Sequence, residues 1–288
     1  MKNSILNNKL FTIIAFCIFW SVLIVFNKFV LNTGIDPLLY FLYYQAIATV
    51  IICFYTFLVR KHSIRVIDLK AIYKITAAGL LIAIALYTTT YGLKLSTSIN
   101  YGFIIKSGVI FGPILAFYFL QEKLSRGKLF LMITFILGLY LLTTGGELVI
   151  PQKGDILIFI SALFFSSSDV LLKKLTNNLP SSIVASARGF AATIFLFLLI
   201  LLSSKSFTFN IPVVYLLVSG VIAAIAQLLV LKVISLSSIS YLSLMTMLAP
   251  VMVSFSGAFF LKEPFTLWHL VGGSIIIVSG ILVQKKGI

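Results

Sequence analysis

Residues 116–125 read AFYFLQEKLS, and residues 257–266 read GAFFLKEPFT. Each stretch is an apolar run that ends in one glutamate beside one lysine, and another apolar run follows at once. Glu122 and Glu263 stand 141 positions apart in a chain of 288 residues, which is close to half of its length. A duplicated chain would show this spacing, so the sequence is best read as two matching halves.

The composition predicts an integral membrane protein. Hydrophobic residues make up 60% of the chain and charged residues 10%, and the mean hydropathy is +1.15. Soluble domains contain about 45–50% apolar and about 25% charged residues. A chain of this size cannot hide so much apolar surface from water, but a lipid bilayer can accommodate it.

The sequence predicts an all-α fold with ten transmembrane helices. A spanning helix needs roughly 20 mostly apolar residues, and these runs are too long and too uniformly apolar for barrel strands. The ten runs of spanning length are 10–31, 38–59, 72–93, 99–120, 128–144, 155–174, 182–203, 212–232, 240–261 and 267–284.

The basic residues predict the orientation. Most of the basic side chains behind the net charge of +15 lie in the short gaps between runs, where they act as signals for membrane orientation. Because they form no continuous basic stripe, we do not expect a nucleic-acid partner. Segments 60–74, 123–128, 173–174 and 285–286 share one side and hold most of the lysine and arginine. We therefore expect a multi-pass protein of the cell membrane with both termini cytoplasmic.

A division at the loop 145–154 gives two repeats, residues 1–146 and 154–288, of five runs each. Because five is odd, the second repeat enters the membrane upside down. Pro37 and Pro180 open the second run of each repeat, 143 positions apart, and Gln45 and Arg188 have the same spacing. Inverted repeats are a transporter architecture, with the binding site near the bilayer midplane between the repeats.

The chain resembles the EamA-type members of the drug/metabolite transporter superfamily. The residues that carry the resemblance are FWS at 19–21 with Lys28, LKLS at 93–96, APV at 249–251, and the helix ends at Glu122 and Glu263. Two features depart from the family pattern: Pro113 is displaced by about a turn, and Gln45 replaces the usual arginine. The resemblance implies a secondary transporter of small metabolites or amino acids, often an exporter.

Lys106 is the most informative single residue. It lies about two turns into the run 99–120, which places its amine about 10 Å below the outer interface. A membrane-embedded cation usually faces a cavity or a partner, so Lys106 is a candidate docking charge for a carboxylate or phosphate of the substrate. The alternative is that its long stem snorkels outward.

Two readings also stay open for Asp169 in the run 155–174. Lys173 follows at i+4 on the same helix face, which favours an intrahelical ion pair. The other reading is a carboxylate that carries a proton during transport, which would couple transport to protons.

Further candidates line a cavity or shape the helices. Trp20 and Tyr87 lie deep enough for cavity lining or packing, whereas Tyr91, Tyr101 and Tyr241 lie nearer run ends, where tyrosines often anchor at the interface. Gln227 is either an interhelical hydrogen-bonding group or a substrate contact. Structural or gating roles are predicted for Pro113, Pro250, Arg188, Glu122 and Glu263.

The sequence lacks the motifs of an enzyme. It contains no HExxH, Cys/His metal cluster or Walker loop, so we expect no catalytic residues, no metal and no cofactor. We predict a carrier that moves a small anionic or zwitterionic metabolite by alternating access. The alternative is a channel-like or scaffold membrane subunit without carrier activity, and a monomer and a homodimer are both compatible with the sequence.

Overall fold

The computed structural model describes residues 2–31, 33–59, 68–96, 103–148, 152–203, 211–260 and 265–286. Within these ranges the chain is helical and forms no strand. Nine of the described helices are long and apolar enough to cross a membrane, and Ile105–Leu120 is a shorter apolar helix that accounts for the tenth predicted run. The prediction of an all-α membrane fold is therefore confirmed.

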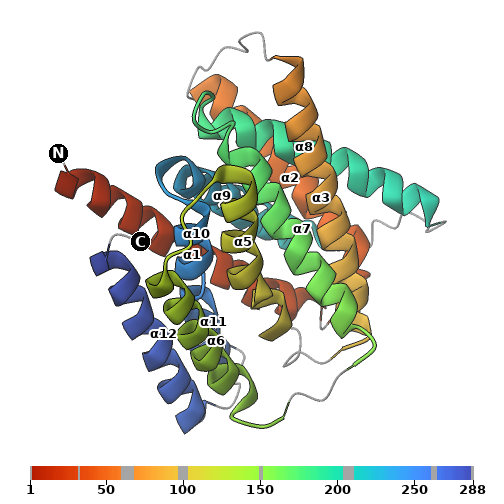
Figure 1. The fold of residues 1–288 in the computed structure, drawn as a ribbon. Helices are drawn as coiled ribbons and strands as arrows, with labels where there is room; N and C mark the ends of the chain where they lie inside the picture. Colours follow the sequence, from red (N-terminus) through yellow and green to blue (C-terminus); the bar gives the residue numbers. More distant parts are fainter. Residues whose placement is uncertain are drawn as a thin grey trace.

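The helices follow one another along the chain (Figure 1). Their bounds are α1 Lys2–Leu31, α2 Pro37–Phe54 with the π-helical turn η1 Tyr55–Val59, α3 Leu69–Lys94, the 3₁₀ turn η2 Ile105–Ser107, α5 Gly108–Leu120, α6 Arg126–Thr144, α7 Asp155–Lys173, α8 Ser181–Leu202, α9 Val213–Leu236, α10 Ile239–Met245, α11 Leu248–Phe260 and α12 Leu267–Lys286.

Local capping sets several of these bounds. The Asp36 side chain accepts hydrogen bonds from the amides of Leu38 and Leu39 at 2.9 and 3.2 Å, and so starts α2. The Ser125 hydroxyl accepts from the third amide of α6. α5 ends where Gln121 adopts a left-handed conformation with φ of 58°. That turn directs the chain, and Glu122 with it, away from the helix axis.

The two halves, α1–α6 and α7–α12, pack into each other. α3 lies along α7 and α8, and in the same way α9 lies along α1 and α2. α5 packs on α7 as α11 packs on α1, while α2 meets α8 and α6 meets α12. The principal contacts between the halves therefore have counterparts with the roles of the halves exchanged, as two repeats related by a twofold axis predict. α1 begins and α12 ends on the same side of the molecule (Figure 1).

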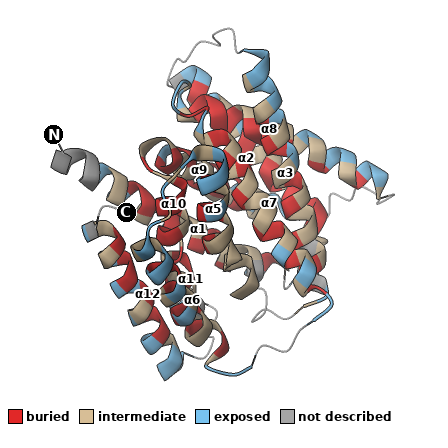
Figure 2. Cartoon of the chain, viewed as in Figure 1, coloured by how far each residue is buried: buried red, intermediate tan, exposed pale blue. Residues whose placement is uncertain are grey.

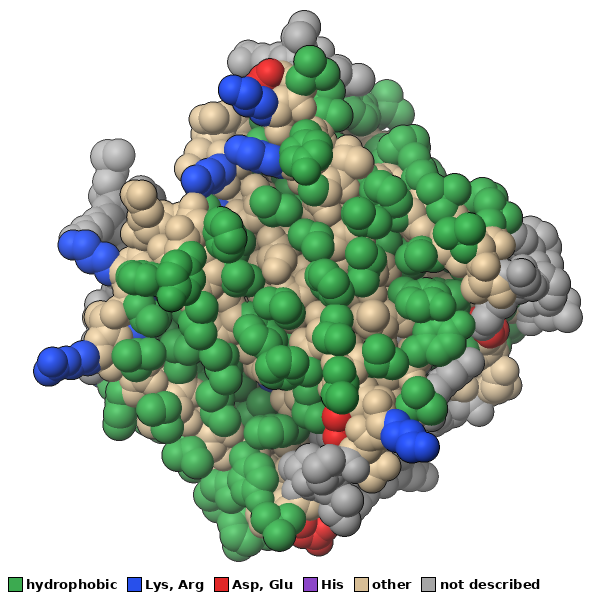
Figure 3. All heavy atoms as spheres, turned by 45° about the vertical axis from the view of Figure 1, so that its right-hand side comes forward, with side chains coloured by type: hydrophobic (Ala, Val, Ile, Leu, Met, Phe, Trp, Pro, Cys, Tyr) green, Lys and Arg blue, Asp and Glu red, His purple; other side chains and the backbone are tan. Residues whose placement is uncertain are grey.

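Buried residues concentrate where the halves meet, and apolar side chains also cover the outside. Figure 2 shows the buried positions along the inner faces of the helices. On the outside, Phe11, Phe190 and Leu202 leave most of their side-chain surface uncovered. Figure 3 shows one such apolar face, with Lys and Arg side chains gathered at its upper left. This surface fits hydrocarbon and not water.

Glycines allow α6 and α12 to approach closely. A Cβ added at Gly272 would lie 2.5 Å from the Gly138 carbonyl oxygen and 2.6 Å from the Leu142 nitrogen. Because both atoms belong to the backbone, no side chain can move aside to make room. Gly280, two turns further along α12, would place its Cβ 3.5 Å from the nearest atom, a methyl group of Leu248.

We expect Gly272→Ala to destabilise the protein and Gly280→Ala to leave it unchanged or slightly more stable. Overpacking at a backbone contact costs about 1–3 kcal/mol, whereas alanine is the better helix former by about 1 kcal/mol where space allows. Thermal unfolding of the detergent-solubilised variants measures both effects. Equal melting temperatures for the two variants would contradict the close α6–α12 contact.

Candidate functional site

The fourth membrane helix of each half is interrupted, and the two interruptions lie at matching sequence positions. In the first half the interruption is the 3₁₀ turn Ile105–Ser107, before α5. In the second half it is the turn at Thr246 and Met247, between α10 and α11. Lys106 and Met247 stand 141 positions apart, as do Glu122 and Glu263. Interrupted helices at corresponding positions of two repeats are the strongest structural indication of a transporter binding site.

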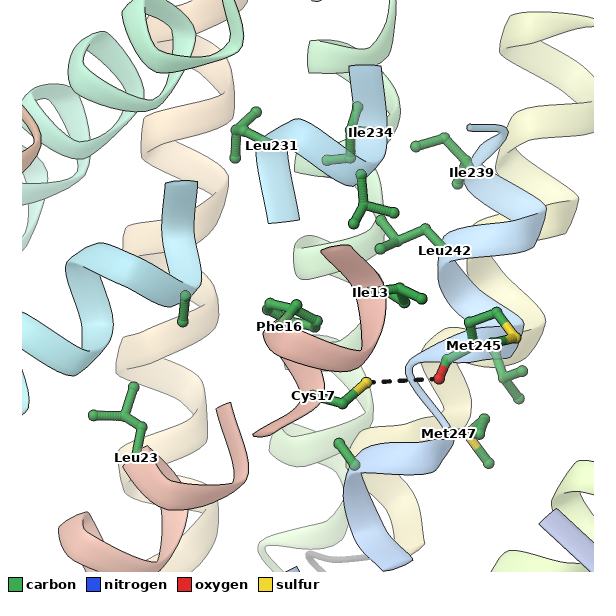
Figure 4. Close-up of a cluster of buried hydrophobic side chains, with 14 of the residues drawn as sticks. Ile13, Phe16, Cys17, Leu23, Leu231, Ile234, Ile239, Leu242, Met245 and Met247 are labelled. Atoms are coloured by element: carbon green, nitrogen blue, oxygen red, sulfur yellow. Dashed lines mark hydrogen bonds between the residues drawn. The ribbon is translucent and has the colours of Figure 1, made fainter. Parts of the chain in front are cut away.

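Pro250 explains the interruption in the second half. Proline has no N–H to donate to the carbonyl four residues earlier, Thr246. The Ala249 amide bonds to Thr246 O instead, at 3.1 Å, and thus leaves its usual acceptor, Met245 O. The Cys17 thiol of α1 donates to that carbonyl over 3.7 Å (Figure 4). A side chain of the first half therefore satisfies the backbone of the interrupted helix.

A serine of α1 makes a second contact of this kind. The Ser21 hydroxyl lies 2.6 Å from Cys17 O and 3.1 Å from Ala249 O. Its counterpart in the second half, Ser166 of α7, faces Gly108 at the start of α5, where an added Cβ would lie 3.2 Å from the Ser166 hydroxyl. Each fourth helix is thus met by a serine from the first helix of the opposite half.

Lys106 lies within the first interruption and is partly buried. η2 packs against α7, and the Lys106 ammonium is close enough to the Cys17 thiol to interact with it electrostatically. The neighbouring Ser107 hydroxyl is buried and has no hydrogen-bond partner among the residues that the structure describes. A cation and an unsatisfied hydroxyl on adjacent residues of a membrane-embedded turn can together bind an anionic group.

Asp169 forms an ion pair across two helices. Its Oδ1 lies 3.5 Å from Nη1 of Arg188 on α8, and both side chains are largely buried. The intrahelical pair with Lys173 is therefore wrong. The Lys173 ammonium donates to the carbonyl of Ile234 at 2.6 Å instead, because that helix end offers a carbonyl without an intrahelical partner.

A second polar pair joins α2 to α9. The side-chain amides of Gln45 and Gln227 exchange two hydrogen bonds, at 3.0 and 3.4 Å. Thr49, one turn after Gln45, lies 3.2 Å from Thr193 of α8. Gln45 and Arg188 occupy matching positions of the two halves, but Gln45 pairs with Gln227 of the opposite half, whereas Arg188 pairs with Asp169 of its own half.

The Glu122 carboxylate caps α10. It accepts from the amides of Ile239 and Ser240 at 2.8 and 3.1 Å and from the Ser240 hydroxyl at 2.7 Å. The structure therefore gives Glu122 backbone partners on the opposite half. Tyr241 is buried at the same end, where its ring lies 3.4 Å from the Lys9 ammonium and its hydroxyl donates to Gln284.

The other candidates are placed as follows. Trp20 stacks on Phe16 of α1, next to Cys17 and Ser21. The ring centroids of Tyr87 and Tyr91 on α3 lie 4.6 Å apart. Tyr87 also packs against a hydrophobic cluster between α2, α3 and α8 that is separate from the main core. Pro113 is buried inside α5. Tyr101 and Glu263 lie outside the described residues.

Sequence reasoning missed the part played by Cys17 and Ser21. Cys17 is an ordinary small buried residue by its sequence context, and only the folded chain shows which carbonyl its thiol meets. A signal did exist for Ser21, because it and Ser166 follow an aromatic residue at matching positions, 145 apart.

The comparisons with known proteins address the fold and the family. The family model described as EamA-like transporter family matches the chain twice, at residues 8–144 and 152–284. A solved crystal structure superimposes with a TM-score of 0.75 at 14% identity, covering 94% of this chain and 98% of that chain. That likeness is one of fold. Comparison with curated proteins found no match.

We expect Asp169→Asn to destabilise the protein more than Arg188→Gln. Removing one partner of a buried ion pair costs about 3–5 kcal/mol because the other charge stays buried. A carboxyl left alone can take up a proton, whereas a guanidinium always keeps its charge. Thermal unfolding of both variants and of Asp169→Asn/Arg188→Gln measures the order. A double variant less stable than Asp169→Asn would contradict the pairing.

Proposed function

The chain belongs to the EamA-like transporter family and is a multi-pass membrane protein, and on this basis we propose that it is a secondary transporter of a small anionic or zwitterionic metabolite. The observation that carries the proposal is the pair of matching helix interruptions, with Lys106 in the first of them. An amine at this depth attracts a carboxylate or phosphate that lipid would exclude.

Packing between the halves supports alternating access. The main helix contacts run between the halves, so a rocking motion of one half against the other changes the surroundings of both interruptions together. Cys17 and Met245 are fully or almost fully buried beside the second interruption. A substrate therefore reaches this level only when the halves separate on one side. Pro250 and Pro113 supply the points at which the fourth helices bend.

The orientation in the membrane follows from the charges. We place the protein in the cell membrane, with both termini in the cytoplasm. The connections between α2 and α3 and between α5 and α6 then lie on the cytoplasmic side, with most of the lysine and arginine. α1 begins and α12 ends on one side of the molecule, which supports this arrangement.

Asp169 is the residue that would couple transport to protons. Its counter-ion is Arg188, and its own helix offers no competing cation because Lys173 bonds to Ile234 O. Lys106 belongs to η2, which packs on α7. Because α7 and α8 belong to the same half, rocking would keep this pair together but would change its exposure to water, and that change would alter the affinity of the carboxylate for a proton.

We expect Lys106→Ala to lower transport at least tenfold and Lys106→Arg to retain most of it. Tenfold corresponds to about 1.4 kcal/mol of lost docking energy. The measurement is uptake and efflux of candidate carboxylates and phosphates in proteoliposomes. Lys153→Ala removes an exposed lysine and serves as the matched control.

The same assay separates a carrier from a channel. A carrier saturates with substrate concentration, whereas a channel gives a flux that rises linearly. An unchanged rate in Lys106→Ala for every transported compound would remove the docking role of Lys106.

We expect a pH gradient of one unit to drive substrate accumulation up to about tenfold in the wild type, if one proton moves with each substrate. Asp169→Asn should still let substrate equilibrate but should not accumulate it. Asp68→Asn changes an exposed carboxylate before α3 and is the control. Gradient-driven accumulation by Asp169→Asn would assign the proton to another group.

A further inference from the structure

α10 is a short helix between two turns, at the end of the bundle where α1 begins and α12 ends. Before it, Ser237 has an extended backbone, with φ of −144° and ψ of 173°, so α10 does not continue α9. After it, the turn at Thr246 and Met247 separates it from α11, and Pro250 prevents the two from joining into one regular helix. α10 can therefore move as a unit without bending α9 or α11.

α10 closes the interior of the bundle at this end. All of its residues except Ser243 are buried. Leu242 points from α10 toward Ile13 of α1 (Figure 4), and one turn further along α1 the Cys17 thiol donates to Met245 O. Ile13 and Cys17 have no exposed surface. Water on this side therefore does not reach Cys17 while α10 is in place.

The corresponding segment of the first half is packed less tightly. Residues 98–104 match α10 at the spacing of 141 positions, and the described residues among them are Phe103 and Ile104. Both are partly exposed, whereas their counterparts Leu244 and Met245 are buried. A symmetric conformation would pack the two segments equally. The described residues therefore show a conformation that is closed at α10 and looser at the matching segment of the first half.

Two charged side chains of the first half hold α10 in this position. The Glu122 carboxylate, which follows α5, accepts from the first two amides of α10 and from the Ser240 hydroxyl. The Lys9 ammonium of α1 lies 3.4 Å from the centroid of the Tyr241 ring. Glu122 and Lys9 are both partly exposed. Water can replace them when α10 moves, so the start of the helix keeps hydrogen-bond partners in both positions.

We propose that α10 is the gate of this carrier on the cytoplasmic side, and that Glu122 and Lys9 form the latch that keeps the gate closed. The inference rests on the carrier function and the membrane orientation proposed above. When the latch is released, α10 turns about the second interruption and uncovers Cys17 from the cytoplasm. The Lys106 ammonium, which is close enough to Cys17 to interact with it electrostatically, then becomes accessible to substrate from that side.

Reaction of Cys17 with a maleimide measures this opening directly and needs no substrate. Cys53→Ser leaves Cys17 as the single thiol of the chain. A membrane-impermeant maleimide is applied to inside-out vesicles, which expose the cytoplasmic face, and to right-side-out vesicles. Labelling after unfolding in SDS gives the full signal.

We expect Glu122→Gln to raise the labelling rate at least about tenfold in inside-out vesicles and to leave the rate in right-side-out vesicles unchanged or lower. The rate follows the open population when opening is fast, and losing hydrogen bonds to a carboxylate shifts that population by about this factor. Lys9→Gln should act in the same direction. Glu147→Gln removes an exposed carboxylate after α6 and is the matched control, with the wild-type rate expected.

The two faces distinguish a gate from a general loss of structure. A variant that is merely destabilised would label faster from both faces and would melt at a lower temperature. The proposal fails if Glu122→Gln labels at the wild-type rate, or if its rate rises equally from both faces. Lys9→Gln decides the matter in the same way if Glu122→Gln does not fold. Unchanged labelling with saturable transport would refute the gate alone, whereas one-sided labelling with a linear flux would refute the carrier function.

Discussion

A membrane interior offers no hydrogen bonds to the backbone, and the rest of this structure depends on that constraint. A continuous helix satisfies its own amides and carbonyls, but an interrupted one must find partners within the protein. Both fourth helices of this chain are interrupted. In the second half the freed carbonyl of Met245 is reached by the Cys17 thiol, and Ser21 contacts Ala249 O one turn further on. The first helix of one half therefore stabilises the weakest point of the other.

This exchange explains why the halves are interleaved and do not fold as separate layers. A half on its own would leave its interrupted helix without the partners that the opposite half supplies. Glu122 provides a second example of this dependence, because its carboxylate belongs to the first half and caps α10 of the second half. A motion that opens the bundle must exchange these partners for others, such as a substrate or water. The polar contacts between the halves are therefore the ones that such a motion would have to break.

The sequence was enough to predict the spans, the repeats and the family resemblance, because hydropathy and the spacing of Glu122 and Glu263 depend only on order along the chain. The partners of polar side chains were not predictable in the same way. Spacing at i+4 suggested Lys173 for Asp169, but Arg188 of α8 holds it, since Lys173 reaches a free carbonyl at the end of α9. Tertiary packing decides which helices are neighbours, and these neighbours cannot be derived from a single sequence.

Differences between the halves are as informative as their likeness. Two identical halves about a twofold axis would offer a substrate the same groups from both sides. The halves differ at several matching positions: Lys106 corresponds to Met247, Arg188 to Gln45, and Ala187 to Tyr44. The first two differences give each half a cation, Lys106 in the first and Arg188 in the second, where the other half has an uncharged residue. A polar substrate with distinct ends needs this kind of asymmetry, because a single orientation is favoured only where its charged end and its apolar end meet different surroundings.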